Sequence, residues 1–170
     1  MVTLNDIAAE VGVSVTTVSR VINDKSAKYR ISKKNRQSKI KQVVEELGYK
    51  PNILARGLRL KRSLSIGLVV PDISNPFFAF VTKVIQTYAH AGGYSLIVCN
   101  TDENIQSEIE QIDLLRSKGV DGFIILPVGT ESTHIQSLLD QKQPLVLLDR
   151  CFDSVNTNSV LVNNFKGAYK

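Results

Sequence analysis

Apolar residues repeat at helical spacing in two short stretches near the start of this 170-residue chain. The first stretch carries Leu4, Ile7, Ala8 and Val11, and the second carries Val18, Val21 and Ile22. Positions i, i+3, i+4 and i+7 share one face of a helix, so each stretch predicts a helix with one buried face. Thr3 and Ser14 stand at N-cap positions, Asp6 completes a partial capping box with Thr3, and Gly12 ends the first helix. The pattern predicts two helices joined by a tight turn.

The second of these helices has a polar face opposite its apolar stripe. That face consists of Thr16, Ser19, Arg20 and Asn23. It suits the major groove of DNA, because arginine can bind guanine through two hydrogen bonds and hydroxyl groups can reach phosphates. Ser32 is expected to cap a third helix, which Gly48 and Pro51 would end. The core face of this helix would hold Ile40, Val43, Val44 and Leu47. The three helices predict a small all-α helix-turn-helix head; an ordinary amphipathic helix pair is the alternative.

Charge divides the chain at about the same place. Residues 1–62 hold 14 Lys and Arg against five Asp and Glu, a net charge of +9. Residues 63–170 hold seven against 11, a net charge of −4. A basic head on a mildly acidic body is typical of a polyanion-binding module fused to another domain. A lysine-rich solvated surface is the alternative.

Beyond residue 62, short apolar runs alternate with helical stripes. The runs are 64–70, 94–99, 122–126, 145–148 and 159–162. The stripes are Phe77, Val81, Val84, Ile85 and Tyr88; Ile105, Ile109, Ile112 and Leu115; and Ile135, Leu138 and Leu139. This alternation predicts right-handed βαβ units and an α/β doubly wound parallel sheet with helices on both faces.

Ligands of such sheets bind at the carboxyl ends of the strands. Asp72, Phe77, Phe78, Asp149 and Arg150 fall there and suit a polar small molecule stacked on aromatic rings. In the alternative interpretation, Asp72 caps a turn and the two phenylalanines seat a helix on the sheet. The loop after the first run has no GxGxxG or GK[ST] motif, so a dinucleotide or P-loop site is not expected. No Ser/His/Asp or Cys/His set is placed for nucleophilic catalysis. The sequence therefore predicts no enzyme and no cofactor.

The cysteines and histidines give no sign of a metal site. Cys99 and Cys151 lack CxxC spacing, and Cys99 ends an apolar run, so it is expected to be a small core residue. His90 and His134 are expected to be isolated surface or helix-end residues. No apolar run approaches the roughly 20 residues that cross a bilayer, and no signal-peptide segment follows Met1. We therefore expect a cytoplasmic protein without a membrane partner.

Sequence motifs in both parts of the chain resemble those of the lactose-repressor (LacI) family of bacterial transcription regulators. The motifs in residues 1–62 are VGVSVTTVSRVIN, EELGYKPN and ARGL. The motifs in residues 63–170 are IGLVVPDISNPFF, GVDGFII and VLLDR. The resemblance covers the entire chain. It implies a sequence-specific DNA-binding regulator, expected to be a repressor, with a palindromic double-stranded operator, a sugar or nucleoside effector, and a homodimeric state.

The resemblance also assigns residues. It implies base reading by Val15, Thr16 and Arg20, and phosphate or groove-edge contacts by Thr3, Ser14, Thr17, Ser19 and Asn23, with Arg30 on the DNA backbone. It implies a hinge helix whose Leu58 inserts into the minor groove, where apolar wedges kink DNA. Phe77, Phe78, Asp149 and Arg150 match positions that line the effector cleft of the family.

These assignments divide the chain into a helix-turn-helix domain at 1–50, a hinge at 51–62, and an incomplete effector-binding domain at 63–170. The last part would be the N-terminal lobe of a domain like the periplasmic binding proteins. The resemblance places a second lobe after Lys170, so we expect a truncated chain with weak operator and effector binding and doubtful dimerisation. The alternatives are a non-functional remnant, a small-molecule-binding α/β module, or a flavodoxin-like enzyme.

Overall fold

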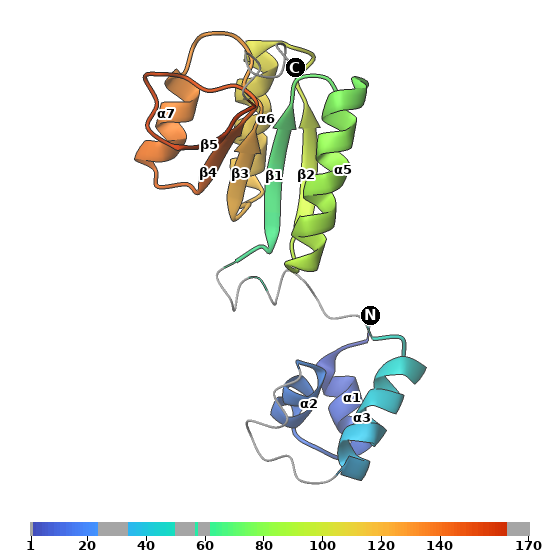
Figure 1. Ribbon diagram of the computed structural model, residues 1–170. Helices are drawn as coiled ribbons and strands as arrows, with labels where there is room; N and C mark the ends of the chain where they lie inside the picture. The colour runs from blue at the N-terminus through green and yellow to red at the C-terminus, as the bar shows by residue number, and fades with distance from the viewer. Residues whose placement is uncertain (1, 24–33, 50–56, 58–61, 163–170) are drawn as a thin grey trace. The chain divides into compact units, whose positions relative to one another are not determined.

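The computed structural model describes residues 2–23, 34–49, 57 and 62–162 (Figure 1). The chain divides into two compact units, Met1–Asn52 and Ile53–Lys170. Two residues assigned to DNA contacts, Arg30 and Leu58, lie outside the described residues. The same is true of two residues expected at helix ends, Ser32 and Pro51. So does most of the expected hinge.

The first unit contains three described helices around one small core. They are α1 (Leu4–Val11), α2 (Val15–Ile22) and α3 (Lys34–Glu46). Each helix contributes one fully buried side chain, and these are Ile7, Val18 and Ile40. The buried residues around them are Ala8, Val21 and Val43. The predicted helices and the apolar faces of α1 and α2 are confirmed.

The end of α3 departs from the prediction. Leu47 was expected in the core, but 39% of its surface is exposed. Gly48 has a φ of 60°, a conformation that favours glycine, and it ends the helix. The chain then turns back, so that the Tyr49 amide donates to the Val44 carbonyl at 3.0 Å and the Tyr49 side chain packs against the core. Tyr49 therefore covers the part of the core that periodicity assigned to Leu47.

The second unit is built on a five-stranded sheet in which every pairing is parallel. The strands are β1 (Ser65–Val70), β2 (Ser95–Asn100), β3 (Gly122–Ile125), β4 (Leu145–Leu148) and β5 (Asn158–Val160). Their order is β2-β1-β3-β4-β5. The chain moves from β1 to one neighbour and then returns past it to β3, so the order reverses at β1. Open α/β sheets bind ligands at the carboxyl ends of the strands beside such a reversal.

Helices lie on both faces of the sheet, as predicted (Figure 1). Helices α6 (Ile105–Ser117) and α7 (Thr133–Asp140) share one core with the sheet, in which Ile112, Leu115 and Leu138 are buried. Helix α5 (Pro76–Ala91) packs on the other face, where Phe78 joins Leu68 of β1. None of the described helices is long and apolar enough to span a membrane.

The predicted stripe of α5 forms its buried face only in part, since Val81 and Ile85 are half-buried and Ile85 packs against the core. Phe77, Val84 and Tyr88 were expected to pack inward, yet all three are exposed. The side chains that α5 buries are Phe78 and Ala89. Apolar residues form a broad arc on this helix, opposite the polar residues Thr82, Lys83 and Gln86, so their spacing does not fix which part of the arc faces the sheet. The cap at its N-terminus and the packing of the sheet make that selection instead.

Candidate DNA interface and ligand-binding edge

A tight turn places α2 against α1. Gly12 adopts a φ of 71°, the left-handed conformation that ends many helices. The amides of Gly12 and Val13 both donate to the Ala8 carbonyl at 3.0 Å, and Val13 packs on the head core. Ser14 then caps α2 by accepting a hydrogen bond from the Thr17 amide at 3.3 Å. The start of α2 is therefore fixed both by backbone hydrogen bonds and by core packing.

The start of α1 is held by a full capping box. The Thr3 amide donates to Asp6 Oδ2 at 2.7 Å, and Thr3 Oγ1 accepts from the Asp6 amide at 3.4 Å. The Thr3 hydroxyl also donates to Asp6 Oδ2 at 2.9 Å. These bonds from the Thr3 backbone and side chain hold the pKa of Asp6 below its ordinary value. Aspartate thus performs the role usually given to glutamate in this motif.

The predicted base-reading residues lie along α2 with different degrees of exposure. Val15 and Thr16, in the first turn, are exposed, and 38% of the Val15 surface is accessible. Arg20, one turn further, is half-buried. Val15 therefore lies outside the core, although its spacing to Val18 was also compatible with burial.

The side chains assigned to phosphates are already hydrogen-bonded within the head. Ser14 and Thr17 join their hydroxyl groups at 2.9 Å. Asn23 donates from Nδ2 to the Ser19 carbonyl at 2.6 Å, which closes the end of α2. Thr3 belongs to the capping box of α1. Hydrogen bonds at the helix ends therefore orient each of these side chains.

At the edge of the second unit, Asp72 closes the turn between β1 and α5. Its Oδ1 accepts hydrogen bonds from the hydroxyl and the amide of Ser74, at 2.7 and 2.8 Å. These two bonds, the hydroxyl first, hold the pKa of Asp72 below its ordinary value. The same turn is tied to β2, because Asn100 Oδ1 accepts from the Ile73 amide at 2.7 Å. The turn-capping role that the sequence left open is therefore present.

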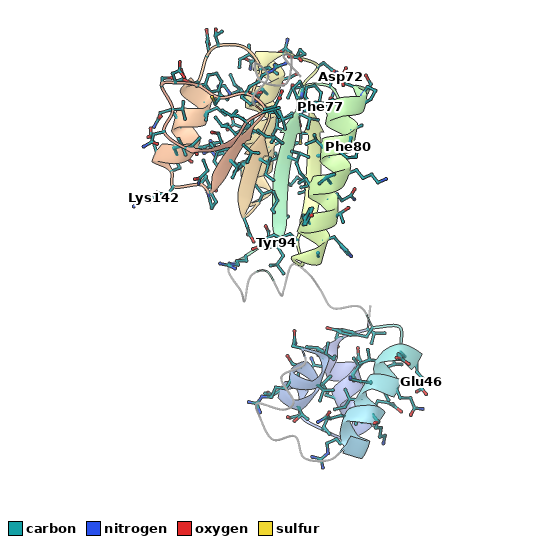
Figure 2. The ribbon with its side chains drawn as sticks, in the orientation of Figure 1. Glu46, Asp72, Phe77, Phe80, Tyr94 and Lys142 are labelled. Carbon is teal, nitrogen blue, oxygen red and sulfur yellow. The ribbon has the colours of Figure 1, made fainter. Side chains whose placement is uncertain are left out.

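The two phenylalanines of this turn face different surroundings. Asn75 caps α5 by accepting from the Phe77 amide at 2.9 Å. Phe78 is buried, with 6% of its surface exposed, and it seats α5 on the sheet. Phe77 is about half exposed, and its ring meets that of Phe78 edge-on with the centroids 5.3 Å apart. Figure 2 shows Asp72 and Phe77 close together at the N-terminal end of α5, with Phe80 further along this helix.

Asp149 and Arg150 follow β4 in a strained turn. Asp149 has a φ of 67°, and its amide donates to the Val160 carbonyl at 2.9 Å. Arg150 reaches across the edge to Glu103, with Nη1 and Nη2 at 3.2 and 3.3 Å from its two carboxylate oxygens. Nη1 also donates to the Pro127 carbonyl at 3.3 Å. The hydrogen bond to Glu103 raises the pKa of Arg150 above its ordinary value.

The structure brings Arg150 to Glu103, a residue that the sequence did not single out. Within residues 62–162, no hydrogen bond joins Asp72 to Asp149 or to Arg150. The proposed ligand-binding residues therefore form two groups along the carboxyl edge, one after β1 and one after β4. Glu103 lies in the loop after β2, so the polar side chains come from three strand ends.

The expectation that His134 is isolated was wrong. Its Nε2 lies 2.6 Å from Oε1 of Glu108, and 8% of the His134 side chain is exposed against none of the Glu108 side chain. Helical spacing held a signal for this pair, because Glu108 stands four residues before Ile112 and His134 stands four before Leu138. Both positions fall on the inward faces of their helices.

The remaining candidate metal ligands are scattered. No group of three His, Cys, Asp or Glu side chains suited to a metal ion occurs among the described residues. Cys99 is buried, as predicted, and burial raises the pKa of its thiol. Cys151 is exposed.

Together, the fold and these two surfaces define a regulator-type architecture: a helix-turn-helix head followed by an α/β lobe with a polar edge at a reversal of strand order. Residues 3–52 match the family model for bacterial regulatory proteins of the lacI family. Residues 63–170 match the model for periplasmic binding proteins and the sugar binding domain of the LacI family. The chain belongs to the LacI family.

Curated relatives and solved structures agree with this assignment. The chain is 40% identical over 162 residues to the ribose operon repressor of Halalkalibacterium halodurans, covering 95% of this chain and 46% of that protein. It is 37% identical over 172 residues to the transcriptional regulator DegA of Bacillus subtilis, covering 99% and 50%. The lac repressor dimer bound to operator and the anti-inducer ONPF aligns with a TM-score of 0.79 and 26% identity, covering 97% and 49%. The chain thus spans about half the length of the relatives it matches.

Proposed function

We propose that this chain binds double-stranded DNA sequence-specifically as a transcriptional regulator, expected to act as a repressor. The observation that carries the proposal is the exposed first turn of α2, held by the Gly12 turn and the Ser14 cap on a packed core. In helix-turn-helix proteins, the N-terminal residues of the second helix contact base edges in the major groove. The net charge of +9 over residues 1–62 supplies attraction to phosphates.

In this proposal, base contacts come from Val15, Thr16 and Arg20. The backbone or groove-edge contacts are assigned to Thr3, Ser14, Thr17, Ser19 and Asn23. Arg30 and Leu58 keep their proposed roles on the DNA backbone and in the minor groove, with a hinge at 51–62. Such a role would place the protein in the cytoplasm, where bacterial DNA is, and requires no enzymatic step or cofactor.

A selection from a randomised double-stranded DNA library tests the proposal. The chain should enrich a defined sequence, and mobility-shift titrations at two salt concentrations should show log affinity falling linearly with log salt. Enrichment of no sequence above the input library would contradict sequence-specific binding. Binding that is tight but independent of salt would contradict the phosphate contacts.

We further propose that the carboxyl edge of the sheet receives a small polar effector, a sugar or a nucleoside. Phe77 offers an exposed ring, while Asp72, Asp149 and Arg150 offer hydrogen-bonding groups. The position beside the strand reversal at β1 supports this location. Phe78 is assigned an indirect part, because it is buried behind Phe77.

Calorimetry with D-ribose and with adenosine probes the two effector classes. Binding of either should be lost in Arg150→Ala and kept in Arg116→Ala, which removes an exposed arginine from α6. Retained affinity in Arg150→Ala would contradict the proposed site. Because the second lobe is not part of this chain, the expected affinities are weak, and absence of binding for both probes at millimolar concentration would contradict effector binding by this edge alone.

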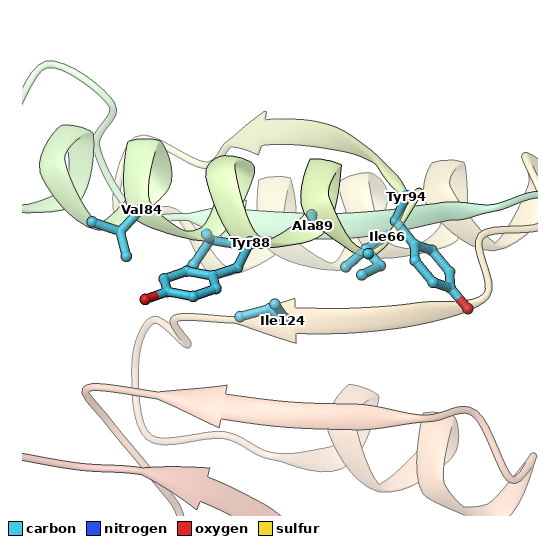
Figure 3. Close-up of a pocket in the computed structure, with 8 residues that line it drawn as sticks. Ile66, Val84, Tyr88, Ala89, Tyr94 and Ile124 are labelled. Atoms are coloured by element: carbon cyan, nitrogen blue, oxygen red, sulfur yellow. The ribbon is translucent and has the colours of Figure 1, made fainter.

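Self-association is the third part of the proposal, because helix-turn-helix proteins read palindromes as dimers. The outer side of α5 presents Phe80 and Tyr88, with 67% and 76% of their surfaces exposed, together with Val84. Val84 and Tyr88 also border an apolar groove of about 380 Å³ over Ile66 and Ile124, which Figure 3 shows between α5 and the sheet. Large exposed apolar patches mark interfaces. We assign this surface to a second copy of the chain.

A further inference from the structure

Glu108 is an acidic side chain in the first turn of α6, and none of its surface is exposed. Burying a carboxylate costs several kcal/mol unless hydrogen bonds compensate it. Both of its oxygens have partners: Oε1 lies 2.6 Å from His134 Nε2, and Oε2 accepts from the Val128 amide at 2.9 Å. The pair therefore connects α6 to α7 and to the loop that follows β3.

The Val128 amide belongs to the same peptide unit as the Pro127 carbonyl. In a trans peptide the N–H and the C=O are coplanar and point in opposite directions. The N–H of this unit donates to Glu108, and its C=O accepts from Arg150 Nη1 at 3.3 Å. One peptide plane thus stands between the buried carboxylate and the guanidinium at the carboxyl edge.

The two residues that form this peptide are packed in the interior. Pro127 and Val128 are buried, and the following residue, Gly129, has a φ of 70°. His134 stands in the first turn of α7, and its contact with Glu108 ties that turn to α6. The orientation of the peptide is consequently set from the buried side.

We propose that Glu108 and His134 are positioning residues for Arg150. They hold the Pro127–Val128 peptide so that its carbonyl faces the guanidinium, while Glu103 holds the other side of that group. The inference deepens the proposed effector site and rests on it for its biological meaning. Neither residue touches the proposed ligand edge directly, because both side chains are buried.

Nuclear magnetic resonance of the ¹⁵N-labelled chain without any ligand tests this inference. Glu108→Met keeps a side chain of similar length but removes both oxygens. We expect the Val128 amide proton to move upfield and exchange faster, and the Arg150 guanidinium signals to shift. Glu108→Gln keeps an oxygen for the Val128 amide and should restore both sets of signals. Glu110→Gln changes an exposed carboxylate of the same helix and should move neither.

A folded Glu108→Met chain with unchanged Arg150 signals would overturn the proposal. If that variant does not fold, His134→Ala gives the same comparison from the other end of the pair: shifts at Val128 and Arg150 support the proposal, and their absence overturns it. Because no ligand is present, the outcome is separate from the effector proposal. Failure of D-ribose and adenosine to bind would remove the effector role while leaving the positioning result intact.

Discussion

The side chain of Leu115 in α6 packs directly over Gly67 of β1 and fills the space that a side chain at position 67 would need. A Cβ placed on Gly67 would lie 2.7 Å from Cδ1 of Leu115, a fully buried side chain. Overpacking of this kind costs about 1–3 kcal/mol in a tight core. We expect Gly67→Ala to lower the free energy of unfolding of the second unit by about that amount, measured by urea denaturation.

A double-mutant cycle tests the cause. Leu115→Ala opens a cavity and should cost about 2–5 kcal/mol alone. In that background, Gly67→Ala should cost less than in the unmodified chain, because its methyl group has room. Additive costs would show that Gly67 is required for another reason.

Asp149 occupies a left-handed conformation at the proposed ligand edge. Alanine is penalised in that conformation by about 1–2 kcal/mol, whereas glycine is not. We expect Asp149→Gly to be more stable than Asp149→Ala by about 1 kcal/mol in urea denaturation. At Asp113, within α6, the same pair should show the reverse order, because glycine disfavours a helix interior. If the glycine variant were more stable than the alanine variant at both positions, or less stable at both, backbone strain at Asp149 would be refuted.

The Thr3–Asp6 capping box makes the head sensitive to acid. The pKa of Asp6 is lowered on folding, so its contribution to stability is present above the unfolded value and lost as pH falls through the folded value. Asp6→Asn should destabilise the head near neutral pH, and its difference from the unmodified chain should shrink below about pH 4. Denaturation followed by resonances of α1 measures this. Glu10→Gln, at the other end of α1, is the control, and an Asp6→Asn effect equal at all pH values would contradict the account.

The exposed side of α5 should govern self-association. Tyr88→Lys places a charge on the apolar surface in place of its most exposed aromatic residue, and hot-spot aromatic residues contribute about 2 kcal/mol or more to interfaces. We therefore expect sedimentation equilibrium to show association weakened by at least about tenfold. His90→Lys adds a charge at an exposed position on the same helix and serves as the control. Equal association of both variants would exclude α5 as the interface.

Much of the fold could be predicted because its signals are local. Thr3, Gly12 and Ser14 mark helix ends through their own backbone and side-chain chemistry, and the apolar runs that became β1 to β4 are separated by helical stripes. The alternation of strands and helices fixes a parallel sheet with few possible connections. The candidate residues at the carboxyl edge followed from that topology.

The features that were missed depend on contacts between distant residues. Arg150 and Glu103 are 47 positions apart, and Glu108 and His134 are 26 apart. In α5, apolar residues form a broad arc that holds both Phe77 and Phe78, so spacing alone does not decide which of the two is buried. Helical spacing can place Glu108 and His134 on the inward faces of their helices, but only tertiary packing brings the two partners of each pair together.

The central claim is that α2 reads bases through Arg20, and DNA selection with Arg20→Ala tests it most directly. Each bidentate contact to guanine contributes about 1–3 kcal/mol of discrimination, so the variant should lose preference at one or more base pairs while retaining salt-dependent binding. Arg36→Ala, an exposed arginine of α3, should keep the selected sequence. A selected sequence that is unchanged in Arg20→Ala would contradict the account.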